Sequence, residues 1–192
     1  TAATRIAANG NIEKETSNLL LQSNTFDTTW NTTRATFVGG QSGYDGTNNA
    51  WAFVNTTDNN THLSVQSFGY GPSIATFSIY AKAGDVNFLA VRFEGNTGVD
   101  YAYFDLANGT LGTIDADYID AKIESVGNGW YRCSGTKSLP NIPDNQLVLL
   151  SAQSDNDPTY AGAGTTAIYI QDAQVEQGLV ARDVLTTTTT AL

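Results

Sequence analysis

Apolar and polar residues alternate along much of the chain. Between residues 73 and 82, Phe77 and Ile79 fall on one side of an extended backbone, and Thr76 and Ser78 fall on the other. A period of two residues is typical of a β-strand with one buried face. Further strands are expected at residues 18–22, 34–38, 51–54, 62–68, 86–94, 101–106, 119–126, 130–136, 146–152 and 165–176. Short strands separated by polar turns predict an all-β fold, an antiparallel β-sandwich.

The sequence VGNGWYRCS at residues 126–134 predicts a tight hairpin. Gly127, Asn128 and Gly129 tolerate the positive φ angles that a short turn requires. Trp130 then begins the returning strand, and two interpretations of its ring are open: a buried aromatic in a core hairpin, or a platform that stacks on a ligand. In the preceding segment, residues 114–126, the alternation of apolar and polar residues changes phase near Tyr118. This change favours a strand that is preceded by a bulge or loop, and the alternative is a helix.

Composition and charge narrow the range of partners. The 192 residues suit one β domain, with 41 % hydrophobic and only 15 % charged residues. A net charge of −10 makes nucleic acid and anionic membranes poor partners and leaves neutral glycans, cations or another protein. The single cysteine, Cys133, excludes an internal disulfide and a multi-cysteine zinc site. With no membrane-spanning run and no visible signal peptide, a protein acting outside cells is expected to leave by another route or within a particle.

We expect three regions along the chain. Residues 1–17 predict a short N-terminal arm, and residues 18–178 predict the sandwich. Residues 179–192 include the threonine run 186–190 and predict a C-terminal arm or linker. This tail is too short to fold alone, so it is expected either to connect domains or to add to the sheet of a partner.

Six blocks of sequence carry a resemblance to a known family. In chain order they are NLLLQSNTFD (18–27, followed by Trp30), YDGT (44–47), TFSIYAKA (76–83), YFDLANGT (103–110), VGNGWYRCS (126–134) and IYIQDAQVE (168–176). Together they resemble bacteriophage structural modules that look like carbohydrate-binding jelly rolls. The resemblance implies a jelly-roll sandwich with extended arms in a tail fibre or a head decoration protein. It further implies a virion location, other virion proteins as partners, contact with host-surface glycans, no enzymatic activity, and homo-oligomers, trimers by analogy with fibres.

The resemblance also implies a structural calcium ion, the one cofactor that we predict. In such jelly rolls, calcium often lies between the first strand region and an aspartate of the last strand. Asp172 matches the last-strand position, and Asp27 is the nearest acidic residue in the first region. The alternative for Asp172 is a solvated or hydrogen-bonded carboxylate without a metal.

Aromatic and polar residues near turns are candidates for a glycan-binding surface. Sugars are bound by flat apolar faces together with amide, carboxylate and guanidinium groups that meet their hydroxyls. The candidate residues are Trp51, Tyr44, Tyr70, Tyr101, Tyr160 and Arg92. The alternative for each ring is partial burial at the rim of a sheet.

An acidic cluster and one histidine are the only candidates for catalysis. Asp115, Asp117, Asp120 and Glu124 could supply the two carboxylates of a polysaccharide-degrading enzyme. The same pattern is common on a solvated strand edge that discourages aggregation. The lone histidine, His62, is expected to be a solvated strand residue. We therefore predict a non-enzymatic glycan-binding module, with a purely structural assembly protein and a glycan-degrading enzyme as alternatives.

Overall fold

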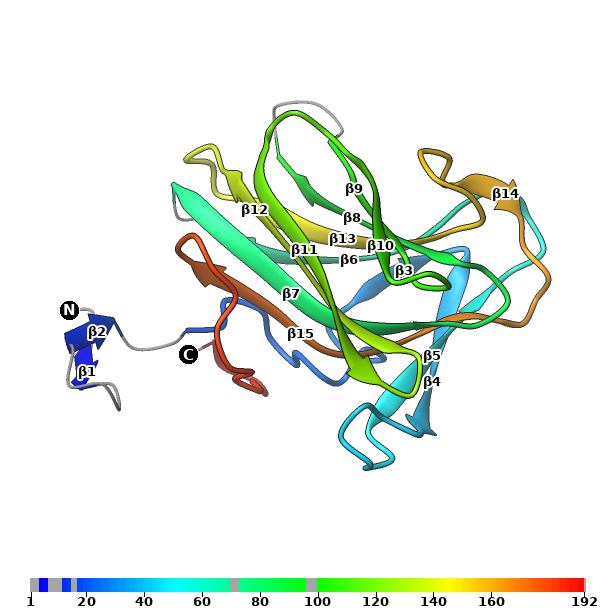
Figure 1. Ribbon diagram of the computed structural model, residues 1–192, viewed down its shortest axis with the longest axis horizontal. Helices are drawn as coiled ribbons and strands as arrows, with labels where there is room; N and C mark the ends of the chain where they lie inside the picture. The colour runs from blue at the N-terminus through cyan, green and yellow to red at the C-terminus, as the bar shows by residue number, and fades with distance from the viewer. Residues whose placement is uncertain (1–3, 7–11, 15–16, 70–72, 96–99, 192) are drawn as a thin grey trace.

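Two antiparallel sheets pack face to face in the computed structural model, which describes residues 4–6, 12–14, 17–69, 73–95 and 100–191 (Figure 1). The six-stranded sheet has the order β11 (Tyr118–Gly127), β12 (Trp130–Ser138), β7 (Ile74–Ala83), β15 (Thr166–Gln177), β5 (Ala50–Asn55), β4 (Ala35–Gln41). The seven-stranded sheet has the order β10 (Thr110–Ile114), β9 (Ala102–Asp105), β8 (Phe88–Glu94), β13 (Asn145–Ala152), β6 (Asn59–Gly69), β14 (Thr159–Ala161), with β3 (Asn31–Thr33) also paired to β6. This arrangement is the predicted sandwich of jelly-roll type.

The chain begins with a small hairpin of its own. Strands β1 (Thr4–Ile6) and β2 (Ile12–Lys14) pair with each other, form a sheet separate from the two large ones, and lie to one side of the sandwich in Figure 1. Among the described residues, no helix is long and apolar enough to span a membrane.

The core lies between the sheets and follows the predicted alternation. Phe77 and Ile79 of β7 are fully buried there, as are Leu147 and Leu149 of β13 on the facing sheet. Cys133 lies in the same cluster, where burial raises the pKa of its thiol. The period of two was therefore a sound guide to which side chains point inward.

The hairpin predicted at Trp130 joins β11 to β12. Asn128 and Gly129 form its turn with φ angles of 55° and 77°. Trp130 is buried, as expected for a structural aromatic, but it lies on the outer face of the six-stranded sheet. It packs there with Tyr80 and Tyr44, so a second, smaller apolar cluster stabilises the outside of this sheet.

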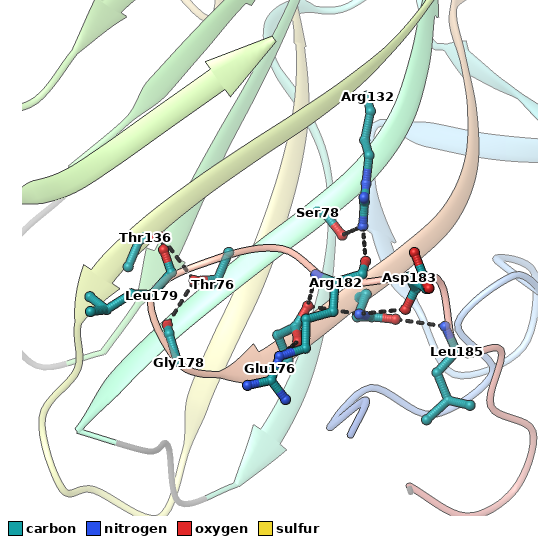
Figure 2. Close-up of polar contacts among 11 residues, drawn as sticks. Thr76, Ser78, Arg132, Thr136, Glu176, Gly178, Leu179, Arg182, Asp183 and Leu185 are labelled. Carbon is teal, nitrogen blue, oxygen red and sulfur yellow. Dashed lines mark hydrogen bonds and ion pairs between the residues drawn. The ribbon is translucent and has the colours of Figure 1, made fainter. Parts of the chain in front are cut away.

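A C-terminal segment, residues 178–191, covers part of this outer face, and we call it the strap (Figure 2). Thr76 of β7 donates a 2.8 Å hydrogen bond to the carbonyl of Gly178, and Arg132 of β12 donates to the carbonyl of Arg182. Glu176 of β15 accepts a 2.9 Å bond from the backbone N–H of Arg182. The tail thus lies against its own domain, whereas the sequence predicted a linker or an arm directed at a partner.

Candidate functional site

The outer face of the seven-stranded sheet gathers polar side chains at one end. The strand register sets Ser67 on β6, Gln146 on β13 and Glu94 on β8 side by side across the sheet. The next row, on the same face, consists of Val65, Val148 and Arg92. Because alternate residues of a strand share a face, Arg92 and Glu94 point to the same side. A polar row thus lies beside a row that is apolar except for Arg92.

Arg92 and Tyr101 form a fixed pair on this face. Nη1 of Arg92 donates a 2.7 Å hydrogen bond to the Tyr101 hydroxyl, and the guanidinium carbon lies 5.3 Å from the centre of the tyrosine ring. Nη2 bonds to Glu94 Oε2 at 2.8 Å. The Nε of Arg92 is buried and makes no hydrogen bond with any of the described residues. The ring of Tyr101 remains partly exposed, so the pair presents an aromatic surface held in one orientation.

A surface cavity of about 390 Å³ adjoins the pair. Its lining residues are Glu94, Gly95, Ile142, Pro143, Asp144 and Gln146. Asp144 accepts a 2.6 Å bond from the Ser67 hydroxyl and a 3.1 Å bond from the Gln146 amide. Glu94 belongs both to the cavity and to the ion pair with Arg92, so the two features form one surface. We call Ser67, Arg92, Glu94, Tyr101, Asp144 and Gln146 the Arg92–Tyr101 face.

The other half of this sheet face is closed. The Asp155 carboxylate accepts bonds of 2.7 and 3.0 Å from the backbone N–H and hydroxyl of Thr113 on β10. The side chain of Tyr103 is only 1 % exposed, and its burial raises the pKa of its phenol. The buried members of the apolar cluster here, which include Tyr103 and Leu150, are therefore not available to a ligand, whereas Tyr101, packed against them, is partly exposed.

Of the six predicted glycan-binding residues, the structure brings Arg92 and Tyr101 together and places Tyr44, Trp51 and Tyr160 elsewhere. Tyr44 stacks on Tyr80 of the opposite sheet, with ring centres 3.6 Å apart. Trp51 donates its indole N–H to the carbonyl of Asn24 at 3.0 Å. Tyr70 lies outside the described residues.

The sixth residue, Tyr160, belongs to a buried polar network. It is 7 % exposed, and its hydroxyl bonds to the side chains of Asn55 and Ser151, so its ring cannot stack on a sugar. His62 lies in the same region with no exposed surface, which corrects the expectation of a solvated histidine. Its ring nitrogens lie 2.8 and 3.2 Å from the carbonyl oxygens of Arg34 and Tyr160. Both residues therefore have structural roles.

The sequence did not reveal Glu94, Asp144, Gln146 and Ser67. Glu94 could have been found, because it follows Arg92 by two residues and so shares its face of the strand. The other three depend on the register of β6 against β13, which no local pattern specifies.

The acidic cluster does not assemble into a pair of catalytic carboxylates. Asp115 accepts a 2.6 Å bond from the backbone N–H of Tyr101, and Asp120 pairs with Lys122 at 3.3 Å. Asp117 lies 4.0 Å from the ammonium group of Lys137. These three carboxylates engage different donors, and Glu124 points outward from β11 opposite Arg132.

The two residues predicted to bind calcium do not fit that ion well. Asp172 is nearly buried, and its carboxylate accepts hydrogen bonds from Tyr44 at 3.1 Å and Gln171 at 3.4 Å. Asp27 is exposed in a turn. No group of three or more acidic, histidine or cysteine side chains suited to a metal occurs within the described ranges. Calcium prefers six to eight oxygen ligands, whereas the Asp172 carboxylate already accepts hydrogen bonds from Tyr44 and Gln171. Calcium binding stays a prediction, tested by thermal melting with added Ca²⁺ or EDTA.

Replacing Asp172 by asparagine is expected to raise the free energy of unfolding at neutral pH. Burial raises the pKa of Asp172 above its usual value of 3.8, despite hydrogen bonds that act in the opposite direction. A carboxyl group whose pKa is higher in the folded state destabilises the fold once it ionises. Urea unfolding at pH 7 should show the gain, and it should vanish below pH 3.8, where the group is protonated in both states. Asp27→Asn, at an exposed site, is the control; an equal gain there would contradict the prediction.

Two solved structures are similar to this chain. The CBM22-1 xylan-binding domain from Paenibacillus barcinonensis Xyn10C is 14 % identical, covers 88 % of this chain and 99 % of that chain, and has a TM-score of 0.49. The CBM22-1–GH10 modules of the Clostridium thermocellum endo-1,4-β-D-xylanase 10B, complexed with xylohexaose, are 13 % identical, cover 86 % of this chain and 28 % of that chain, and have a TM-score of 0.48. No protein-family profile and no curated protein match the sequence. By its strand pairing, the protein is a jelly-roll β-sandwich.

Proposed function

We propose that this protein is a non-enzymatic glycan-binding module that uses the Arg92–Tyr101 face. The observation that carries the proposal is the partly exposed Tyr101 ring, held by Arg92 beside a cavity with two carboxylates. An aromatic ring can pack against the C–H face of a sugar, and fixed carboxylates and amides can accept or donate hydrogen bonds to its hydroxyls. This combination occurs on one accessible surface of the sandwich.

Neutral glycans are the class that suits this surface. The protein carries a net charge of −10, and Glu94 and Asp144 add two acceptors at the cavity. Arg92 is already paired with Glu94, so the face holds no surplus positive charge for an anionic sugar. Hydrolysis is not part of the proposal, which assigns Glu94 and Asp144 to accept hydrogen bonds from sugar hydroxyls beside those they accept from the protein.

Replacing Tyr101 by alanine is expected to weaken glycan binding about tenfold or more, the scale of one lost aromatic contact. Tyr101→Phe keeps the ring and should lose less. Affinity electrophoresis against a panel of soluble neutral polysaccharides, followed by calorimetry on the best ligand, measures both. Tyr169→Ala, a tyrosine of the opposite sheet, is the matched control.

Two results would count against this function. One is a protein that retains its circular dichroism spectrum yet binds no polysaccharide of the panel or of a glycan array at high sugar concentration. The other is binding that Tyr101→Ala and Tyr169→Ala change to the same extent. Hydrolysis of a bound polysaccharide would reject the non-enzymatic part.

We further propose that the module is carried on a bacteriophage particle, as part of a fibre or a decoration protein. The support is the ordered set of six sequence blocks over residues 18–178. Immunogold labelling of purified particles tests it, and particles without label would reject it. The alternative of a purely structural assembly protein relied on both terminal arms, and the strap lies on its own domain.

A further inference from the structure

Strand β11 is an unprotected edge of the six-stranded sheet. It pairs with β12 on one side and, among the described residues, with no strand on the other (Figure 1). Its ladder with β12 is regular from Asp120 to Ser125, and bulges occur only at the two ends. An edge of this kind leaves a row of backbone N–H and C=O groups that can pair with another strand.

The other edges of the sandwich are interrupted. The pairing of β4 shifts between Val38 and Gln41, where Gly40 has a φ of 78°. The pairing of β10 shifts after Leu111, and a backbone N–H of that strand, at Thr113, is already bonded to Asp155. β14 has only three residues. Bulges and short strands are common means of preventing edge pairing, and the central part of β11 has neither.

The charges on β11 alternate in sign on its outer face. Asp120, Lys122 and Glu124 all point outward and are exposed to solvent. Charges that prevent edge pairing would repel a second copy of the strand in every register. In this strand, the order negative–positive–negative permits attraction, because antiparallel pairing can set Lys122 of one copy opposite an acid of the other.

We propose that two copies of this chain associate through antiparallel pairing of β11 with β11, related by a two-fold axis at Ile123. In this register, Lys122 of each copy lies opposite Glu124 of the second copy, and Ala121 lies opposite Ser125. The two salt bridges are equivalent by symmetry, as a closed dimer requires. The six-stranded sheets of the two copies then form one continuous sheet.

Other registers fit less well. Residues that pair directly must point to the same face of the sheet, so their positions differ by an even number. The two-fold axis therefore passes through a residue, and not through the bond between two residues. An axis at Lys122 or Glu124 sets like charges opposite each other. An axis at Ala121 pairs Asp120 with Lys122 but extends the ladder into the bulge next to Tyr118. The axis at Ile123 keeps all three central pairs within the regular part of β11.

Reversing the charge of Lys122 tests the pairing. Sedimentation velocity, from micromolar to millimolar protein, measures the fraction of dimer. Wild type is expected to form a dimer as concentration rises. Lys122→Glu should weaken the dimer about tenfold, because two attractive pairs become repulsive. The double variant Lys122→Glu with Glu124→Lys should restore the wild-type dissociation constant within about threefold. Lys82→Glu, which changes the net charge equally, is the control and should leave dimerisation unchanged.

Cysteine cross-linking tests the register. When Ala121→Cys and Ser125→Cys variants are mixed and oxidised, the heterodimer is expected to form a disulfide, because these positions face each other across the axis. Three results overturn the proposal: a monomer at every concentration, equal effects of Lys122→Glu and Lys82→Glu, or a faster disulfide between two chains that both carry Cys at position 121. Glycan binding is measured separately, so failure of one proposal leaves the other standing.

Discussion

Replacing Asn18 by alanine is expected to lower the free energy of unfolding by roughly 4 kcal/mol, because four hydrogen bonds of about 1 kcal/mol each, three of them buried, are lost. The Asn18 side chain has no exposed surface. Its amide nitrogen donates to the carbonyls of Ala173 and Leu185 at 3.1 and 2.9 Å. Its amide oxygen accepts from the backbone N–H groups of Leu20 and Val175 at 3.1 and 3.2 Å.

These four bonds join three segments that are distant in sequence. One amide group connects three segments: the residues around Leu20 that lead into the sandwich, the last strand β15, and the strap. Asparagine suits the position because a single small group supplies both donors and acceptors. Without it, the backbone groups of Ala173, Leu20 and Val175 lose their partner at buried positions, which costs more than the bonds alone.

Urea unfolding followed by circular dichroism measures the effect of Asn18→Ala. Asn141→Ala, in an exposed connection, is the control and should change stability by less than about 0.5 kcal/mol. Asn18→Asp keeps the two acceptors but loses both donors and buries a charge, so its loss should be at least as large. A loss below about 1 kcal/mol for Asn18→Ala would show that the three segments are held together in another way.

The long strands could be predicted from the sequence because their burial has a period of two. Phe77 and Ile79 show this plainly, and Asn128–Gly129 marked the hairpin turn. The strand expected at residues 18–22 is wrong: the amides of Leu20 and Leu21 bond to the side chains of Asn18 and Gln66 instead of a neighbouring strand. The strap could not be predicted. It binds largely through backbone groups, and its partner side chains, such as Gln174 and Glu176, are polar residues on the outer face of β15. Such residues resemble solvent-exposed positions until a covering segment is placed over them.

The candidate site was predictable only in part. Tyr101 was identified as an aromatic residue beside a polar turn, and Arg92 as a donor for sugar hydroxyls; the sequence did not pair them. Residue type alone could not separate Tyr101 from Tyr160, since both flank polar turns. What distinguishes them is that Tyr160 lies over the buried polar pair Asn55 and Ser151, a contact between β5, β13 and β14. Contacts of this range are set by topology and leave no local pattern.

Trp130→Ala is expected to destabilise the protein by about 3–5 kcal/mol, the range for removing a buried large aromatic. The ring is 2 % exposed and packs in the outer cluster with Ala50, Tyr80 and Val184. Its centre lies 6.4 Å from that of Tyr44 in an edge-to-face arrangement. Because Val184 belongs to the strap, the cavity left by alanine should also weaken the attachment of the strap to the sheet.

Two measurements separate this structural role from stacking on a ligand. Urea unfolding should show the loss for Trp130→Ala and a smaller one for Trp130→Phe, which keeps a ring in the cluster. Hydrogen exchange of the Leu185 amide, which donates to Gln174 at 2.8 Å, should accelerate in Trp130→Ala. If stability and exchange stay as in wild type while glycan binding is lost, Trp130 is a ligand platform. Its burial among Tyr44, Tyr80 and Val184 argues for the structural role, because a sugar could reach the ring only if these neighbours moved away.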